Sequence, residues 1–410
     1  MQTQSPIRIG FLCHGDVYDQ SSMSGSPASA WKALSRHNVK LFHINAGLKK
    51  QDKHSSSFSY LKQPLAQKSL NLFNKISQKS QKILLRPFEY KIVLNNAIEE
   101  GIALTEVINR LELDVIVGVC VSRSIYNITT EVPIVHSSDA TALLLNSTYP
   151  DRLNASQGHR RACEEIERGA MQKISAGVFP SLRTLESAIK DYGLPRDKGF
   201  LVPFGANVLP PENMVITPDP PTNKNLKLIV IASQPKRKRV DFCLEITEIL
   251  VQKGIQATLN YIGSPDTKII KSPLVNYLGK LRLSDEKDRR IHQQTLAESH
   301  FLLLPSIGEM YGIAPCEAAH FGRPSLVSDV GGLSTVVVNN ETGFVMPLDA
   351  KAEDYANIIE QLCYQTQRYM EISNNARRRA VNELNWDSWS VKMMDIISQV
   401  IGQKSVTKVN

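Results

Sequence analysis

The feature that most constrains the fold is an alternation of short apolar runs with longer segments of helical character, repeated along the whole chain. This alternation is typical of layered α/β domains built on mainly parallel sheets. At 410 residues the chain exceeds one ordinary hydrophobic core, so we expect about two domains. The strand-like runs are IRIGFL, VKLFHI, DVIVGVCV, VPIVHS, SAGVFPS and GFLVPFG in the first half, and LKLIVIAS, QATLNYIG, LVNYLG, HFLLLPS and RPSLVSD in the second.

A proline-rich segment separates the two halves. Residues 207–225 contain five prolines and no hydrophobic periodicity, and prolines at this density interrupt both helix and sheet. We therefore predict a first domain at 1–207, a linker at 208–225, a second domain at 226–385 and a C-terminal helix at 386–410. The two domains are expected to be similar and to face each other across a cleft.

Composition places the chain among soluble globular proteins, with 42% hydrophobic and 21% charged residues. No apolar run approaches the roughly 20 residues that a membrane-spanning helix needs, and the N-terminus lacks the pattern of a signal peptide. The six cysteines stand far apart without metal-ligand spacing, which favours reduced thiols over a disulfide framework or zinc site. These observations predict a cytoplasmic protein with no metal site.

The positive charge is concentrated in one segment. The net charge is +8, and residues 49–91 hold ten Lys or Arg against two acids, with apolar residues near helical spacing. One interpretation is a solvated helical excursion; the other is a surface for anionic lipid, where each basic residue contributes about 1 kcal/mol. Aromatic residues are sparse there and no recognition motif is present, so nucleic acid is not the expected partner. Peripheral association with the inner face of the membrane stays an alternative.

Two glutamates near the C-terminal end have seven residues between them. Glu309 lies on the loop after the strand HFLLLPS, and Glu317 lies in the helix that begins near Tyr311 or Gly312. A helix N-terminus binds phosphate through its free N–H groups, and carboxylates bind vicinal hydroxyls. Phosphate flanked by diols is the chemistry of a sugar nucleotide. The alternative is structural, with Glu317 interacting with the helix dipole and Glu309 solvated.

A serine-rich loop with one glycine, HGDVYDQSSMSGSP, follows the first strand and precedes a helix. Gly25 and Ser26 are placed for close approach of the backbone to a ligand. The loop does not carry the GxGxxG dinucleotide fingerprint, and the chain has no GxxxxGK[ST] phosphate loop.

The stretch PSIGEMYGIAPCEAAHFGRPSLVSDVGGLSTVVVNNETGFVMP resembles the E-x7-E signature, double-glycine loop and G-F turn of the retaining glycosyltransferases of family 4. The resemblance implies the GT-B fold, two Rossmann-like domains across a cleft, with C-terminal helices crossing back to the first domain. It also implies that Glu309 contacts hydroxyls of the donor sugar and Glu317 the ribose hydroxyls. The other implied donor-binding residues are Gly25, Ser26, Gly205, Ser306, Met310, Tyr311, Gly312, Ile313, Gly331 and Gly332.

Two further stretches carry the same resemblance. VPIVHSSDATA places Asp139 at a position of the cleft that faces donor or acceptor. His136, at the end of the same strand, is a second catalytic candidate; the alternative is a packed histidine, which is commoner at such a position. ASQPKRKRV supplies Arg237 and Lys238, a basic pair expected to bind the diphosphate. Here the chain departs from the family pattern, because Arg239 stands where a glycine often follows the lysine.

The resulting prediction is a metal-independent, retaining hexosyltransferase. No Asp-x-Asp triplet occurs, so Arg237 and Lys238 would neutralise the leaving diphosphate, and no cofactor is expected. The predicted donor is a UDP- or GDP-sugar, and the acceptor a glycan, a lipid or a small molecule, in the synthesis of a cell-envelope polysaccharide, glycolipid or related glycoconjugate. The alternatives are an epimerase or phosphorylase of the same architecture, and a non-catalytic basic protein that binds lipid or nucleic acid.

Overall fold

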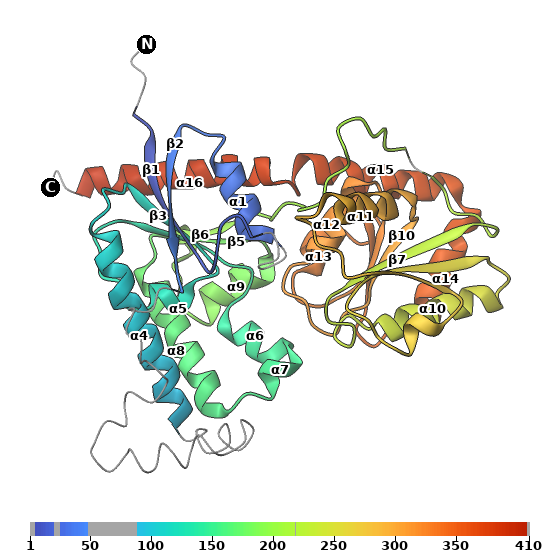
Figure 1. The fold of residues 1–410 in the computed structure, drawn as a ribbon, viewed down its shortest axis with the longest axis horizontal. Coiled ribbons are helices and arrows are strands. Elements are labelled where there is room, and N and C mark those ends of the chain that lie inside the picture. The colour runs from blue at the N-terminus through green and yellow to red at the C-terminus, as the bar shows by residue number, and fades with distance from the viewer. Residues whose placement is uncertain (1–4, 20–24, 48–87, 218, 408–410) are drawn as a thin grey trace.

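The computed structural model describes residues 5–19, 25–47, 88–217 and 219–407. It contains two α/β domains, each built on a six-stranded parallel sheet (Figure 1). The strand order is β2-β1-β3-β4-β5-β6 in the first sheet and β12-β11-β10-β7-β8-β9 in the second. The predicted fold class is confirmed.

The elements of the first domain follow the expected alternation. Its strands are β1 (Ile7–Cys13), β2 (Val39–Asn45), β3 (Val115–Val119), β4 (Ile134–Ser137), β5 (Ala176–Phe179) and β6 (Gly199–Leu201). Its helices are α1 (Ser26–Leu34), α4 (Glu89–Ile108), α5 (Ser122–Ile125), α6 (Ala142–Thr148), α7 (Pro150–Leu153), α8 (Gln157–Lys173) and α9 (Leu182–Lys190), with a 3-10 turn at Arg196–Lys198.

The second domain repeats the pattern. Its strands are β7 (Leu226–Ala232), β8 (Ala257–Gly263), β9 (Val275–Gly279), β10 (Phe301–Leu304), β11 (Ser325–Ser328) and β12 (Gly343–Met346). Its helices are α10 (Val240–Gln252), α11 (Glu286–Glu298), α12 (Ile313–His320), α13 (Leu333–Val336), α14 (Ala352–Tyr364) and α15 (Thr366–Asn382), with a 3-10 turn at Ile269–Lys271. The chain then continues as α16 (Trp386–Thr407).

Both faces of each sheet are buried, which explains why the strands are continuous apolar runs rather than alternating ones. In the first sheet Val115 and Val117 pack in one core cluster with residues of α1 and α16. Ile116, between them, packs in a second cluster with residues of α4 and α8 on the opposite face. All four residues of β10 are likewise buried.

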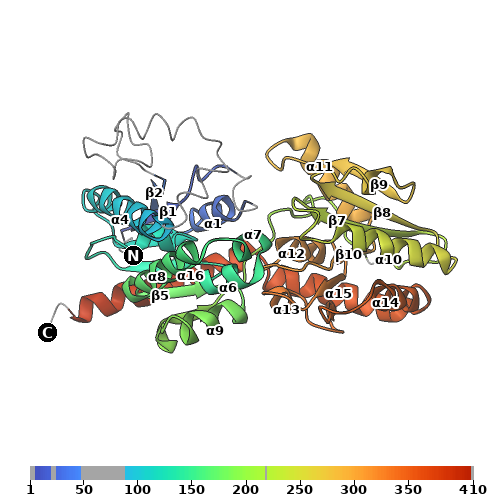
Figure 2. The ribbon, with the colours of Figure 1, turned by 90° about the horizontal axis from the view of Figure 1, so that it is seen from below.

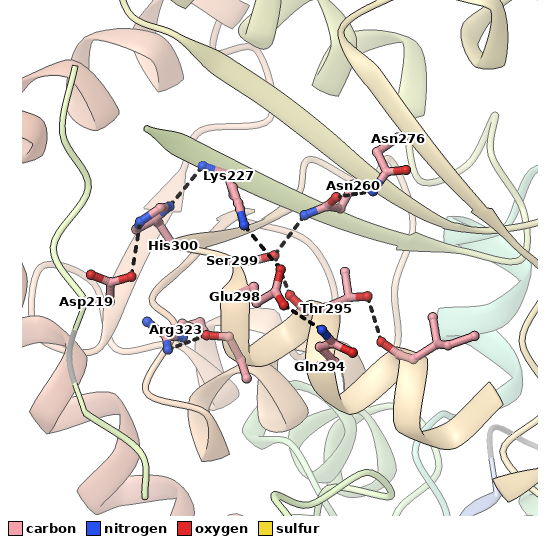
Figure 3. Close-up of polar contacts among 12 residues, drawn as sticks. Asp219, Lys227, Asn260, Asn276, Gln294, Thr295, Glu298, Ser299, His300 and Arg323 are labelled. Atoms are coloured by element: carbon pink, nitrogen blue, oxygen red, sulfur yellow. Dashed lines mark hydrogen bonds and ion pairs between the residues drawn. The ribbon is translucent and has the colours of Figure 1, made fainter. Parts of the chain in front are cut away.

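The predicted linker lies between the two sheets, because β6 ends at Leu201 and β7 begins at Leu226. The exact domain limits stay predictions. At the end of this segment Asp219 lies 3.8 Å from the Nε2 atom of His300 (Figure 3). His300 in turn accepts a hydrogen bond from the backbone N–H of Lys227, at the start of β7, over 2.9 Å. Burial lowers the pKa of His300 to about 4, so this contact does not depend on an imidazolium at neutral pH.

The same close-up shows how the first residues of β7 are tied to the end of α11. Lys227 Nζ forms an ion pair with Glu298 over 3.2 Å, and Asn260 donates to Ser299 Oγ over 3.3 Å (Figure 3). Lys227 and Ser299 lie at the N-terminal ends of β7 and β10, at the edge of the sheet away from the loops described below, and Asn260 lies in the middle of β8.

The C-terminal helix crosses from the second domain to the first, as predicted. In Figure 1 α15 lies on the second domain, and α16 runs along the first. Asp387 pairs with Arg36, and Ser390 Oγ lies 2.9 Å from His37 Nε2, just after α1. Gly205 lies where the chain crosses, because a Cβ there would overlap the backbone at Trp386.

Residues 48–87, which make up most of the basic segment predicted at 49–91, lie outside the described residues. Lys91 lies in α4. In the part of the chain that the structure describes, no helix is both long and apolar enough to cross a membrane.

Candidate active site

The two loops that carry the predicted charged residues meet at one edge of the second sheet. Arg237 and Lys238 follow β7, and Glu309 follows β10. Strands β7 and β10 are neighbours and parallel, so their C-terminal ends lie side by side. In open parallel sheets this edge is where ligands bind.

Glu309 is paired with both cations. Its Oε2 atom lies 3.1 Å from Arg237 Nη1 and 3.6 Å from Lys238 Nζ, and the three side chains are 11–14% exposed. Arg237 also donates through Nε to Gln234 over 2.7 Å and through Nη1 to the carbonyl of Gly308. Because the charges are largely withdrawn from water, each holds the others in place. The predicted site residues are therefore brought together, with the carboxylate contacting the cations directly.

The first domain covers this cluster with the corner between α6 and α7. The guanidinium of Arg237 lies 5.0 Å from the centre of the Tyr149 ring, which is a cation–π geometry. A Cβ on Gly308 would lie 2.9 Å from the carbonyl oxygen of Thr148, so this close approach favours glycine. Figures 1 and 2 both show α6 and α7 extending from the first domain toward the second. Next to this contact the two domains pack closely at Leu144, Thr148, Arg183, Thr184, Met310 and Gly331, which leave no room for a water-sized cavity.

Arg239, which stands where the family pattern often has a glycine, adopts a backbone conformation that favours glycine. This residue is the N-cap of α10 and has φ of 51° and ψ of 55°, the left-handed region that favours glycine. A non-glycine residue there costs about 1–2 kcal/mol. Its guanidinium lies 3.7 Å from the centre of the Phe242 ring, so part of this strain is offset by a cation–π contact within the helix.

The double glycine supports the loop that carries Glu309. Gly331 has φ of 60°, and a Cβ there would overlap the carbonyl of Glu309. A Cβ on Gly332 would lie 2.6 Å from the carbonyl oxygen of Met310 and 2.7 Å from Cβ of Ser181 in the first domain. The two glycines therefore let three backbone segments pack together, which fixes the position of Glu309.

Glu317 is buried in α12, with 4% of its surface exposed. Burial raises the pKa of its carboxyl to about 8, although hydrogen bonds from the Val208 and Asn207 backbone and the charge of Lys238 act in the opposite direction. His292 Nε2 lies 3.6 Å from its Oε2 atom, and burial lowers the pKa of this histidine to about 4. At neutral pH the two groups are therefore mainly uncharged, and the ribose contact stays a prediction.

The N-terminus of α12 lies next to Glu309. Gly312 is its N-cap with φ of 106°, and no side chain caps the helix. Tyr311 is buried and donates to the carbonyl of Phe204 over 2.8 Å, which joins this turn to the first domain. The hydroxyl of Ser306 is buried with no hydrogen-bond partner among the described residues. Met310 and Ile313 complete the turn, so these predicted donor-binding residues lie together.

The N-terminus of α1 is also uncapped by a side chain. Gly25 is its N-cap with φ of 86°, and Ser26 is the first helical residue. Gly205 has a different environment. The chain crosses at Trp386 so closely that only a residue without a Cβ fits at this position. For all three residues the predicted donor contact stays a prediction.

Asp139 follows β4, and His136 lies within it. Burial raises the pKa of Asp139, the thiol of Cys120 and the backbone N–H of Asp139 lower it, and the charge of Glu309 raises it further. His136 is completely buried and its Nε2 accepts from the backbone N–H of Val121 over 3.3 Å. The ring therefore has a structural contact, and its catalytic role stays a prediction.

Sequence reasoning missed three residues: Tyr149, Cys120 and His292. Cys120 directly follows the apolar run DVIVGV, and its place at a strand end could have identified it. Tyr149 lies at a helix terminus and His292 on a helix face. Their partners, Arg237 and Glu317, are far away in the sequence, so no local signal indicates either residue. Among the described residues no group of three His, Cys, Asp or Glu side chains is placed to hold a metal ion.

Comparisons of sequence with known proteins match part of the chain. Residues 225–365 match the family model described as "Glycosyl transferases group 1". A D-inositol 3-phosphate glycosyltransferase from Jonesia denitrificans is 28% identical over 116 residues, which are 28% of this chain and 27% of that protein. The chain thus matches only about a quarter of this relative's length.

Solved structures match the chain over almost its whole length. Sucrose-phosphate synthase from Thermosynechococcus elongatus is 15% identical with a TM-score of 0.65, covering 97% of this chain and 100% of that one. Alr3699/HepE from Anabaena, in complex with UDP, is 14% identical with a TM-score of 0.58, covering 96% and 100%. The described residues therefore have the GT-B fold, and residues 225–365 are similar to the group 1 glycosyl transferases.

Proposed function

We propose that the chain is a retaining glycosyltransferase of the family 4 type, which moves a sugar from a nucleoside-diphosphate donor to an acceptor hydroxyl. The observation that carries the proposal is the cluster of Glu309, Arg237 and Lys238. It lies beside the uncapped N-terminus of α12, at the ligand-binding edge of a domain that matches the group 1 glycosyl transferases.

In this reaction the bond between the anomeric carbon and the diphosphate breaks, and the acceptor oxygen bonds to the same face of that carbon. The departing diphosphate keeps the electron pair of the broken bond, and the proton of the acceptor hydroxyl passes to it. Arg237 and Lys238 would shift from Glu309 to the diphosphate, where negative charge develops. Glu309, released from them, would hold sugar hydroxyls and so orient the anomeric carbon.

We propose that the reaction needs no metal or cofactor, because two cations and a helix N-terminus already supply positive charge at the leaving group. The donor is a sugar nucleotide, and UDP in the complex of the similar Alr3699/HepE favours testing UDP-sugars first, followed by GDP-sugars. The ribose would bind at Glu317, whose pKa of about 8 would fall as hydroxyls donate to it.

The test is to incubate the purified chain with a panel of UDP- and GDP-sugars, with and without a chelator, and to measure release of nucleoside diphosphate. We expect release from one donor, insensitive to the chelator. NMR of the product should show the anomeric configuration of the donor. A product of opposite configuration would disprove retention, and loss of activity with chelator would disprove metal independence.

The matched controls are two glutamate substitutions. Glu309→Gln should lose transfer, whereas Glu371→Gln, at a half-exposed position on α15, should keep it. A panel in which no donor is bound and none is turned over would disprove the proposed function itself.

The acceptor is proposed to bind on the first domain, on the side of Asp139 and Tyr149. A hydroxyl of a cell-envelope glycan, a lipid or a small molecule fits the reaction. Adding soluble extract and membrane extract separately to the donor assay would distinguish them. Stimulation by membrane extract, with sedimentation of the chain on anionic vesicles, would support the peripheral association proposed from residues 49–91.

A further inference from the structure

The first domain carries a strained turn beside the cleft. Cys120, immediately after β3, has φ of 52°, in the left-handed region that side chains rarely enter. Among the described residues only Arg239 and Asn340 share this combination of a side chain and a positive φ. Strained residues gather at functional sites, where the surrounding structure holds them.

Two contacts hold this turn. The backbone N–H of Cys120 donates to the carbonyl of Ser137 over 2.8 Å. The next N–H, of Val121, donates to Nε2 of His136 over 3.3 Å. His136 is completely buried, and burial lowers its pKa to about 4, so Nε2 keeps the lone pair that accepts this bond.

The turn brings the thiol to a carboxylate. Cys120 Sγ lies 3.6 Å from Oδ1 of Asp139, and burial raises the pKa of the thiol so that it keeps its proton and acts as donor. The backbone of Asp139 is held separately, because Thr184 Oγ1 donates to its carbonyl over 2.8 Å. One contact therefore fixes the main chain of Asp139, and the thiol contacts its carboxylate.

We propose that Cys120 is a positioning residue for Asp139, held in its strained turn by His136, and that its thiol directs the carboxylate toward the substrates. The inference rests on the proposed function, in which Asp139 faces donor and acceptor. His136 then acts through the backbone rather than on the substrate, which accounts for its complete burial.

Three substitutions at Cys120 separate the effect of its hydrogen-bond donor from the effect of its backbone strain. Cys120→Ser keeps a hydrogen-bond donor, Cys120→Ala removes it in the strained turn, and Cys120→Gly removes it while relieving the strain. We expect kcat to fall about tenfold in the Ala and Gly variants with the dissociation constant for donor unchanged, and to stay within about threefold of the wild type in the Ser variant. Because glycine suits this backbone, the Gly variant is expected to fold even where Ala does not.

Wild-type kcat in the Gly variant would overturn the proposal, since strain alone would then explain Cys120. A Ser variant as slow as the Ala variant would overturn it as well. Asn340→Gly controls for relief of strain elsewhere, and Cys163→Ala for loss of a thiol; both should leave kcat unchanged.

The pH profile supplies a readout that a purely structural role would not move. The groups that face Asp139 are Cys120 at the end of β3 and Glu309 on the β10–α12 loop; the thiol lowers the pKa of Asp139 and Glu309 raises it. Removing the thiol should therefore move the acid limb of kcat to higher pH in the Ala and Gly variants. An unmoved limb would contradict the proposal.

An infrared measurement tests the contact without any activity. The S–H stretching band of Cys120, assigned by difference from Cys120→Ser, should lie at lower frequency in the wild type than in Asp139→Ala. Equal frequencies would overturn the contact. If the wild type neither binds nor turns over any donor, the proposed function fails, and this band still decides whether the thiol is bonded to Asp139.

Discussion

The two sides of the cleft are built differently. The second domain contributes ionised side chains that hold each other, with Glu309 between Arg237 and Lys238. The first domain contributes an aromatic ring at Tyr149 and a carboxylate at Asp139 that contacts a protonated thiol. The charged side of the cleft, Glu309 with Arg237 and Lys238, is therefore assembled within the second domain alone. The covering side, Tyr149 and Asp139 of the first domain, reaches it only through contacts across the cleft.

The largest expected effect tests the charged side. Replacing Glu309 by alanine should lower kcat about 100-fold or more, because the sugar loses its orientation. Binding of nucleoside diphosphate should be unchanged or tighter, since Arg237 and Lys238 no longer pair with the carboxylate. Calorimetry of nucleotide binding beside turnover measures both. Weaker nucleotide binding in this variant would show that the carboxylate, rather than the cations, anchors the donor.

The next prediction concerns the charge state of Glu317. Its pKa of about 8 lies above the value of about 4.3 in an unfolded chain, so between these values the folded chain binds more protons. The contribution of Glu317 to stability should therefore fall as the pH rises from 5 to 9, by about 2 kcal/mol or more, whereas buried histidines such as His136 and His300 act in the opposite direction in both chains. Urea unfolding of wild type and Glu317→Gln measures this contribution, as the change with pH in the difference between their free energies of unfolding. An equal pH dependence in both chains would exclude this role of Glu317.

Tyr149 tests whether the first domain matters to the charged side. Removing the ring in Tyr149→Ala should raise the KM for donor about three- to tenfold, because a cation–π contact with Arg237 contributes about 0.5–2 kcal/mol. Tyr149→Phe keeps the ring face and should stay near the wild type. Initial rates over a donor titration provide the comparison. An Ala variant equal to the wild type would mean that the charged side works alone.

The smallest effect is expected at Arg239. Glycine would relieve about 1–2 kcal/mol of backbone strain but remove the contact with Phe242 and add flexibility to the unfolded chain. We expect the free energy of unfolding to change by less than about 1 kcal/mol, and the KM for donor to stay the same. Denaturant titration and donor kinetics check this. A marked rise in KM would show that Arg239 contacts the diphosphate.

The charged side was also the easier side to predict from sequence. Glu309 and Glu317 stand on one loop and helix, so local spacing indicated them, whereas Arg237 and Lys238 were indicated by the resemblance of ASQPKRKRV to the family pattern. The strands were predictable because a sheet buried on both faces requires apolar runs. The position of α16 on the first domain was expected from the resemblance and is confirmed.

The covering side could not be predicted in the same way. The contact of Tyr149 with Arg237 joins residues of different domains, and no spacing encodes it. The direction of the Cys120 side chain depends on a left-handed backbone that a cysteine rarely adopts. The burial of His136 is the exception, because a histidine at a strand end is more often packed than catalytic, and all four residues of β4 are buried.

The crossing of α16 has a mechanical consequence. The chain passes between the domains twice, and the two passages touch: Ala206 N–H donates to Leu384 O over 3.2 Å, and Trp386 Nε1 donates to Asn207 Oδ1 over 2.9 Å. Two separate connections would define an axis and allow rotation only about it. Two connections bound at one point act instead as a single pivot. Opening of the two domains would therefore turn about Gly205, and it would separate Tyr149 from Arg237.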